Sequence, residues 1–311
     1  MVPMRLFRLA VVAGACIALS VGAPMLIEAA SPAPAMGFVP DDPTPPALPT
    51  EPPAPASTPL PSSANGLADR GPRAAAPAAE GQPTVIGTSV VGRPLTVFQF
   101  GRGEREVMIA AGIHGGYEWN TIALADALIE LLRKEPERIP ADTTLFILRA
   151  MNPDGEARSR SYGGRANENG VDLNRNWPVN WHPDWDRTGC WAYLPITGGV
   201  HPASEPEVQA VMAFILGHEI EALISYHSAA LGIFPGGDPP DLASQELAAA
   251  IAEVSGYRYP PLDYGCEFTG GFVDWATSMG IPAVDLELNT HADLDYAVNL
   301  KVLEMFLAWR P

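Results

Sequence analysis

Apolar residues after residue 84 follow two periods, one typical of strands and one typical of helices. Short apolar or β-rich runs predict strands at 84–90, 94–100, 105–112, 143–149, 222–227 and 282–288. Apolar residues at helical spacing predict helices at 118–134, from 204 onward, at 241–255, from 270 onward and near 293–309. The first two strands flank Val91–Arg93 and indicate a hairpin, and Ser204–Glu207 indicates a capping box with proline in the first helical turn.

Strands and helices alternate along this part of the chain. The alternation predicts one α/β domain, residues 84–311, with a mixed, mostly parallel central sheet and helices on both faces. In such sheets ligands bind beyond the carboxyl ends of the strands. His114, His227 and Glu287 each fall at or just past such an end. We therefore expect these three side chains on one rim of the sheet.

The first 83 residues have a different character. Arg5 and Arg8 precede an uncharged, mostly apolar run over 9–27, which is typical of a signal peptide or membrane anchor within residues 1–30. Cleavage after Ala35 and lipid attachment at Cys16 both remain open. Residues 31–83 hold 15 of the 33 prolines and predict a disordered, Pro/Ala-rich linker. We expect the domain outside the cytoplasm, with a possible membrane tether through the N-terminus.

The net charge of −17 provides no basic surface for nucleic acid, so we expect no nucleic-acid partner. Apart from Cys16, the chain has two cysteines, Cys190 and Cys266. In an oxidising compartment they form a plausible disulfide, and two free thiols are the alternative.

A catalytic zinc ion usually takes three ligands of the His, Asp or Glu type and keeps one position for water. His114 and Glu118 are close in sequence, and Gly115 and Gly116 allow a tight backbone path between them. His227 follows from a distant strand. This pattern predicts one zinc ion held by His114, Glu118 and His227.

The most specific signal is the stretch 152–178, NPDGEARSRSYGGRANENGVDLNRNWP. Together with GIHGGYE, ASEPEVQA, ISYHS, GGFVDWA and DLEL, in this order, it resembles the M14 zinc carboxypeptidases. The resemblance is strongest to the compact bacterial branch that includes murein peptide amidase. It covers about residues 86–288, nearly the whole predicted domain, and implies the zinc carboxypeptidase fold.

The resemblance also implies roles for individual residues. Asn174 and Arg175 match the pair that binds the terminal carboxylate of the substrate, and Arg165 matches the arginine that stabilises the oxyanion. Arg158 and Arg160 are nearby alternatives for the oxyanion role. Glu287 matches the general base and acid, and Asp172 matches the carboxylate that orients the first ligating histidine. Each role suits the residue type, since the planar fork of arginine is well shaped for a carboxylate.

Three positions depart from the family pattern. Three residues, not two, separate His114 from Glu118. Cys266 stands where many members carry a tyrosine of the cleft, with Tyr264 as the nearest substitute for substrate binding. Val273 falls where larger members read the terminal side chain, and an apolar residue there argues against a basic preference.

We therefore expect a monomeric zinc metallocarboxypeptidase that acts on peptides outside the cytoplasm, with a zinc-activated water and a glutamate base. One alternative is a murein peptide amidase that acts on cell-wall peptides. Another is a catalytically silent domain that binds the cell envelope, and a third is a deacylase of small N-acyl amino acids.

Overall fold

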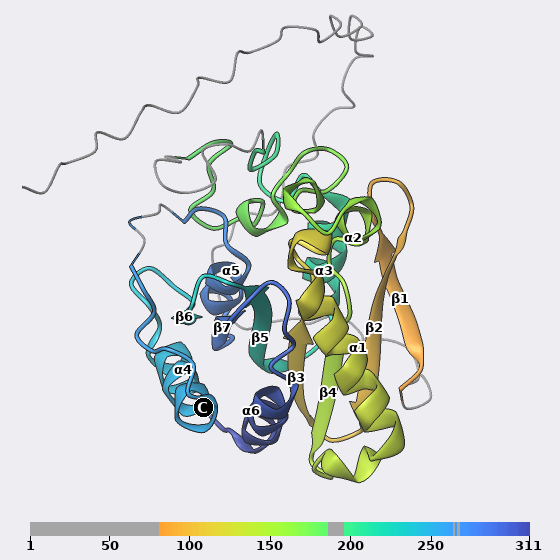
Figure 1. The fold of residues 1–311 in the computed structure, drawn as a ribbon, viewed down its shortest axis with the longest axis vertical. Coiled ribbons are helices and arrows are strands. Elements are labelled where there is room, and N and C mark those ends of the chain that lie inside the picture. The colour runs from red at the N-terminus through yellow and green to blue at the C-terminus, as the bar shows by residue number, and fades with distance from the viewer. Residues whose placement is uncertain (1–80, 186–195, 264, 266–267) are drawn as a thin grey trace, which may run out of the picture. The chain divides into compact units, whose positions relative to one another are not determined.

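The computed structural model describes residues 81–185, 196–263, 265 and 268–311. Their strands form one seven-stranded sheet in the order β1-β2-β4-β3-β5-β7-β6 (Figure 1). The strands are β1 (Pro83–Thr88), β2 (Pro94–Gly101), β3 (Arg105–Ala110), β4 (Thr143–Leu148), β5 (Ile220–Ser228), β6 (Ile233–Pro235) and β7 (Ala283–Leu288). The signal or anchor expected at 1–30 and nearly all of the linker expected at 31–83 lie outside the described residues.

The sheet is parallel in its centre and antiparallel at its edges. The pairs β3–β4, β3–β5 and β5–β7 are parallel, whereas β1–β2, β2–β4 and β6–β7 are antiparallel. The predicted mixed sheet and the predicted hairpin are confirmed. Parallel pairing concerns only the four central strands, because a short β6 and the β1–β2 hairpin close the two sides.

Helices cover both faces of the sheet. They are α1 (Trp119–Lys134), α2 (Pro153–Arg158), α3 (Pro206–Leu216), α4 (Leu242–Ser255), α5 (Phe272–Ser278) and α6 (Tyr296–Ala308). Helices α1, α4 and α6 pack on one face, where Leu128, Ile251 and Phe306 are fully buried. Helices α3 and α5 pack on the other. Alternate residues of the same strands supply both cores, as the two-residue period of a strand requires.

Most predicted elements appear within a few residues of their expected bounds, but one local prediction is wrong. The N-cap of α3 is Glu205 rather than Ser204, and no side chain caps the helix. The Ser204 hydroxyl donates to Glu205 Oε1 at 2.6 Å and accepts from Asn176 Nδ2 at 2.9 Å. A long-range contact with Asn176 has therefore replaced the local cap, although Pro206 opens the helix as predicted.

The sequence analysis did not predict two short elements, α2 and β6. Both carry too few residues to show a hydrophobic period. Four 3₁₀ turns complete the described chain: η1 (Gly115–Glu118), η2 (Pro136–Arg138), η3 (Tyr162–Gly164) and η4 (Leu173–Arg175). Within the described ranges, no helix has the length and apolar character that crossing a membrane demands.

A buried arginine ties the last helix to the sheet. Arg105, at the start of β3, donates to the carbonyls of Leu307 at 3.3 Å, Phe306 at 3.4 Å and Trp309 at 2.7 Å. These carbonyls belong to the C-terminal end of α6, whose partial negative charge favours a cation. Arg105 thus satisfies acceptors that helix geometry leaves unpaired.

We expect Arg105→Ala to lower the free energy of unfolding by about 2 to 3 kcal/mol, the scale of buried charge-assisted hydrogen bonds. Urea denaturation followed by circular dichroism measures the change. The control is Lys301→Ala, a change at an exposed cation on the same helix. Equal stability of the two variants would contradict this account of α6.

Candidate metal centre and substrate cavity

The turn after β3 carries two of the three expected ligands. His114 precedes η1, and Glu118 ends it at the start of α1. Gly115 has φ +48°, and a Cβ on Gly116 would lie 2.1 Å from the Ser159 carbonyl oxygen. Only glycine fits this close backbone approach. The 3₁₀ turn accommodates the additional residue and still directs both side chains to one point.

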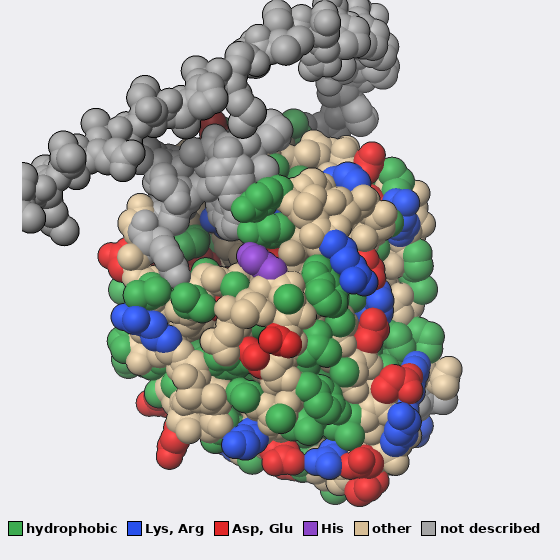
Figure 2. Space-filling model, viewed as in Figure 1, with side chains coloured by type: hydrophobic (Ala, Val, Ile, Leu, Met, Phe, Trp, Pro, Cys, Tyr) green, Lys and Arg blue, Asp and Glu red, His purple; other side chains and the backbone are tan. Residues whose placement is uncertain are grey.

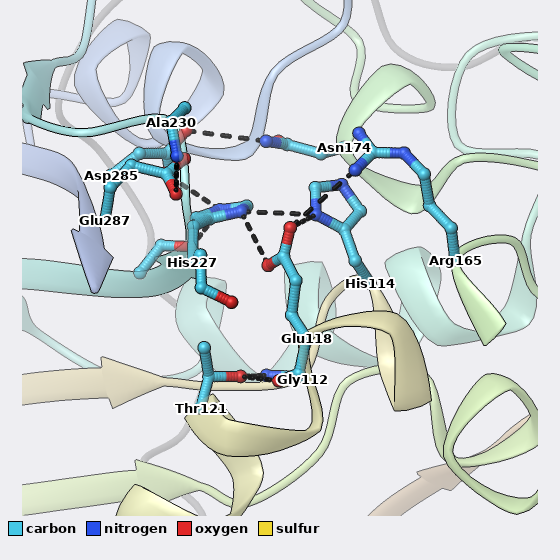
Figure 3. A network of polar contacts seen from close by, with 12 residues as sticks. Gly112, His114, Glu118, Thr121, Arg165, Asn174, His227, Ala230, Asp285 and Glu287 are labelled. Carbon is cyan, nitrogen blue, oxygen red and sulfur yellow. Dashed lines mark hydrogen bonds and ion pairs between the residues drawn. The ribbon is translucent and has the colours of Figure 1, made fainter. Parts of the chain in front are cut away.

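His114, Glu118 and His227 converge although they come from two distant places in the chain, the turn after β3 and the strand β5 (Figure 3). Their ligand atoms all lie within 4.8 Å of one another. His114 Nδ1 is 2.7 Å from Glu118 Oε1, and His227 Nδ1 is 3.2 Å from Glu118 Oε2. All three residues are buried.

The chemistry of this cluster fits a divalent cation. The two Nδ1 atoms face each other at 3.3 Å, so a single proton or a cation must separate their lone pairs. Glu118 Oε2 is buried and has no hydrogen-bond partner among the described residues, its 3.2 Å contact with His227 being an ion-pair distance only. Two imidazoles, one carboxylate and an open side form the usual donor set of a catalytic zinc ion.

The other ring nitrogen of His114 faces Asp172. His114 Nε2 is 3.2 Å from Asp172 Oδ1, and Arg165 donates to Asp172 Oδ2 from Nε at 2.9 Å. Burial opposes ionisation of Asp172, but Arg165 and His114 hold its pKa well below the usual range. A permanent carboxylate here fixes the tautomer in which His114 Nδ1 is free to bind a metal.

His227 also has partners on its other nitrogen, and the sequence analysis did not identify them. Its Nε2 lies 3.0 Å from Ser225 Oγ and 3.1 Å from Asp285 Oδ1. Burial lowers the pKa of His227, but Asp285 and Glu118 outweigh it and raise the pKa well above the ordinary value. Burial opposes ionisation of Glu118, but His114 and His227 lower its pKa below the ordinary value. The acids and histidines of the cluster therefore favour one another's charged forms.

Glu287 lies beside the cluster as expected from its strand end. It is the register partner of His227 in the parallel β5–β7 pair. Ala230 N–H donates to Glu287 Oε2 at 2.9 Å. Burial raises the pKa of Glu287 to about 8. A cation bound nearby would lower this pKa again, because it favours the carboxylate.

The predicted carboxylate-binding pair lies on η4. Arg175 is only 2% exposed, and its Nη1 donates to the Asn174 carbonyl at 2.8 Å. The guanidinium carbon lies 5.2 Å from the ring centre of Trp185 and 5.3 Å from that of Phe268. Asn174 Oδ1 accepts from Phe272 N–H at 2.8 Å, so α5 fixes this amide.

These groups surround one cavity of about 760 Å³, which is large enough for a small molecule or for the end of a peptide. Its lining includes His114, Glu118, Arg165, Asn174, Arg175 and Glu287. The sequence neighbours Arg158 and Arg160 do not line it: Arg158 pairs with Glu168, and Arg160 lies 4.3 Å over the Trp119 ring. Tyr264, Cys190 and Cys266 lie outside the described residues.

The cavity also contains residues that the sequence analysis missed. Asp285 and Asp274 line it, as do Tyr117 and His291, whose ring centres are 4.6 Å apart. The sequence could have identified Asp285, because this residue precedes Glu287 by two positions on the same strand and therefore shares its face. Tyr117 is part of the lengthened His114–Glu118 spacing, which places a phenol ring in the wall.

On the described part of the face shown in Figure 2, Lys and Arg side chains are mixed with Asp and Glu side chains.

Comparisons with known proteins agree with this geometry. Residues 82–304 match the family described as zinc carboxypeptidase. Mouse carboxypeptidase A6 is 30% identical over 239 residues, which covers 63% of this chain and 52% of that protein, so the chain spans about half the length of this relative. Murein peptide amidase A of Escherichia coli K12 is 30% identical over 211 residues, with 65% of this chain and 78% of that protein covered.

Among solved structures, murein-tripeptide amidase from Escherichia coli O157 superposes with a TM-score of 0.56 at 25% sequence identity. The match covers 77% of this chain and 95% of that one.

We expect one zinc ion to bind per chain and to stabilise the fold. At a free zinc concentration of about a thousand times the Kd, the free energy of unfolding should rise by about 4 kcal/mol. Elemental analysis and thermal denaturation with and without chelator measure both effects. His227→Ala should lose them, whereas His201→Ala, a change at an exposed histidine, should keep them. Zinc binding that survives His227→Ala would contradict the ligand set.

Proposed function

The chain belongs to the zinc carboxypeptidase family, and from this premise we propose that it hydrolyses the C-terminal peptide bond of peptides outside the cytoplasm. His114, Glu118 and His227 would hold one zinc ion. The observation that carries this proposal is Arg175, a buried cation in the cavity whose lining also includes His114 and Glu118. A planar guanidinium in this position suits a free substrate carboxylate.

Zinc, when bound, would supply a Lewis acid that polarises the scissile carbonyl and lowers the pKa of a water molecule to about 7. Arg165 provides a second positive charge at the same place. Its guanidinium is fixed by Asp172 and lies 3.7 Å from Glu118 Oε1. A charge held in place before the reaction stabilises a developing oxyanion without reorganisation.

Glu287 would take the proton from the attacking water and deliver it to the leaving amine nitrogen. Glu287 lies beside the ligand cluster, and a carboxylate there is of the type that serves as general base. The hydrogen bond from Ala230 keeps one oxygen fixed, so the other is available for the water. Asn174 would assist Arg175 in holding the terminal carboxylate, and Tyr264 remains a further candidate for substrate binding.

A murein peptide amidase is the second candidate. It is favoured by the murein peptide amidase relatives, whose length this chain covers more fully than that of carboxypeptidase A6. The apolar N-terminal segment and the proline-rich stretch support a tethered protein that reaches cell-wall peptides. A catalytically silent envelope-binding domain is less well supported, because the buried His114, Glu118 and His227 could hold a metal ion and Glu287 lines the adjoining cavity.

Glu287→Gln should lower kcat by about 10²- to 10⁴-fold, since it removes the base but preserves the shape of the side chain and the bond from Ala230. The KM and the bound zinc should change little. Steady-state kinetics and metal analysis of the variant test both points. Glu253→Gln on the exposed side of α4 is the control, and full activity of Glu287→Gln would overturn the mechanism.

Recognition of the free terminus gives a separate prediction. The protein should cleave a peptide acid about 100-fold faster in kcat/KM than its C-terminal amide, and Arg175→Met should remove most of this preference. Arg158→Met on the surface is the control. A muropeptide assayed beside these substrates separates the two candidate functions, and equal turnover of acid and amide by the wild type would contradict the carboxypeptidase.

A further inference from the structure

We propose that His291 binds the substrate through Nε2, which accepts a hydrogen bond from a backbone N–H on the N-terminal side of the bond that is cleaved. The proposal rests on the carboxypeptidase function above and adds a residue that lies outside all the motifs of the family resemblance. It concerns the part of the cavity wall where the start of α1, the end of β5 and the segment after β7 meet.

A buried asparagine fixes the directions of the hydrogen bonds in this wall. Asn120, the second residue of α1, is fully buried. Its Nδ2 donates to the carbonyls of Thr290 at 2.7 Å and Asp293 at 2.9 Å, so Oδ1 is the atom that faces Ser228. An amide oxygen only accepts, and Ser228 Oγ therefore donates its proton to Asn120 Oδ1 at 2.8 Å.

This series of donors and acceptors determines the tautomer of His291. The Nδ1 atom of the ring lies 3.1 Å from Ser228 Oγ. Because the only proton of that hydroxyl is engaged with Asn120, Nδ1 carries a proton and donates it to Ser228 Oγ. Nε2 of the neutral ring is then an acceptor, and it has no hydrogen-bond partner among the residues that the structure describes. Burial lowers the pKa of His291, which favours this neutral form.

The ring of His291 is also supported by an aromatic neighbour. Its centre lies 4.6 Å from that of Tyr117, whose own ring centre lies 5.0 Å from that of Tyr162. Tyr117 belongs to the lengthened spacing before Glu118, so the residue that departs from the family pattern packs against this ring. His291 and Tyr117 both line the cavity. An acceptor that is already held in place loses little conformational entropy when it binds a donor.

The position of His291 indicates which part of a substrate it meets. It contacts Ser228 and Tyr117, which adjoin two of the metal ligands in the chain, whereas Arg175 lies beside two other aromatic rings. A peptide with its terminal carboxylate at Arg175 and its scissile carbonyl at the metal ligands continues past them with its preceding residues. The first donor on that side is the N–H of the residue that contributes the scissile carbonyl. His291 Nε2 is an acceptor for this group.

The test compares two peptides with the full-length, zinc-loaded protein. Both end in the same residue and the same scissile peptide bond, and they differ only in the preceding linkage, which is an amide in one and an ester in the other. The ester replaces the N–H by an oxygen atom, so it removes the donor and preserves the shape. We expect kcat/KM for the amide peptide to exceed that for the ester peptide by about 10-fold, because the ester leaves the acceptor unpaired.

His291→Phe should bring this ratio close to one, because the ring can still pack on Tyr117 but carries no acceptor. His291→Gln should keep most of the ratio, since its amide oxygen places an acceptor near the position of Nε2. His201→Phe, at an exposed histidine outside the cavity lining, is the control and should keep the full ratio. A merely structural role of His291 would lower the turnover of both peptides together and leave their ratio at the wild-type value.

Equal kcat/KM of the amide and ester peptides in the wild type would overturn the proposal and leave the carboxypeptidase function intact. So would a wild-type ratio in His291→Phe, or a ratio in His291→Gln that is as low as in His291→Phe. If His291→Phe does not fold, His291→Leu provides the same measurement. Failure of the wild type to cleave either peptide would instead reject the carboxypeptidase function itself.

Discussion

Three metal-ligating groups buried within 4.8 Å of one another set the main constraint on this molecule. Two imidazole nitrogens and a carboxylate repel one another or remain unsatisfied unless a proton or a cation lies between them. The fold tolerates this arrangement because it delivers each group from a rigid position. His227 lies on a central strand. His114 and Glu118 lie on a turn whose glycine residues allow close packing against the segment 155–164, which includes the end of α2 and η3.

The side chains around the two ligating histidines are constrained as well, because each histidine has a partner on its other ring nitrogen. Asp172 faces the first histidine, and Arg165 compensates the charge of Asp172. Ser225 and Asp285 face the second histidine. Each ligating histidine therefore has a partner on its other ring nitrogen, and the partners come from different segments. Such a network is stable only when all of its members are present, which ties the chemistry of the centre to correct packing of the whole domain.

The cavity beyond the centre holds charges of both signs. Its lining includes the buried cation Arg175 and the acids Asp285 and Glu287. Asp285 and Glu287 come from the same strand, and alternate residues of a strand share a face. One rigid element therefore supplies the proposed base and a second acid of the cavity.

The sequence alone determined the element order, the position of His114, His227 and Glu287 at strand ends, and the identity of the family. These features depend on local periodicity and on motifs that are continuous in the chain. The tertiary structure decided which arginine enters the cavity, since Arg158, Arg160 and Arg165 look alike in sequence but differ in what they contact. It also decided that a 3₁₀ turn absorbs the extra residue before Glu118 and that Ser204 contacts Asn176 instead of capping α3. Only the tertiary structure showed that Asp285, Tyr117 and His291 line the cavity. Side-chain directions and contacts between distant segments settle such questions, and neither is encoded in a pattern of neighbouring residues.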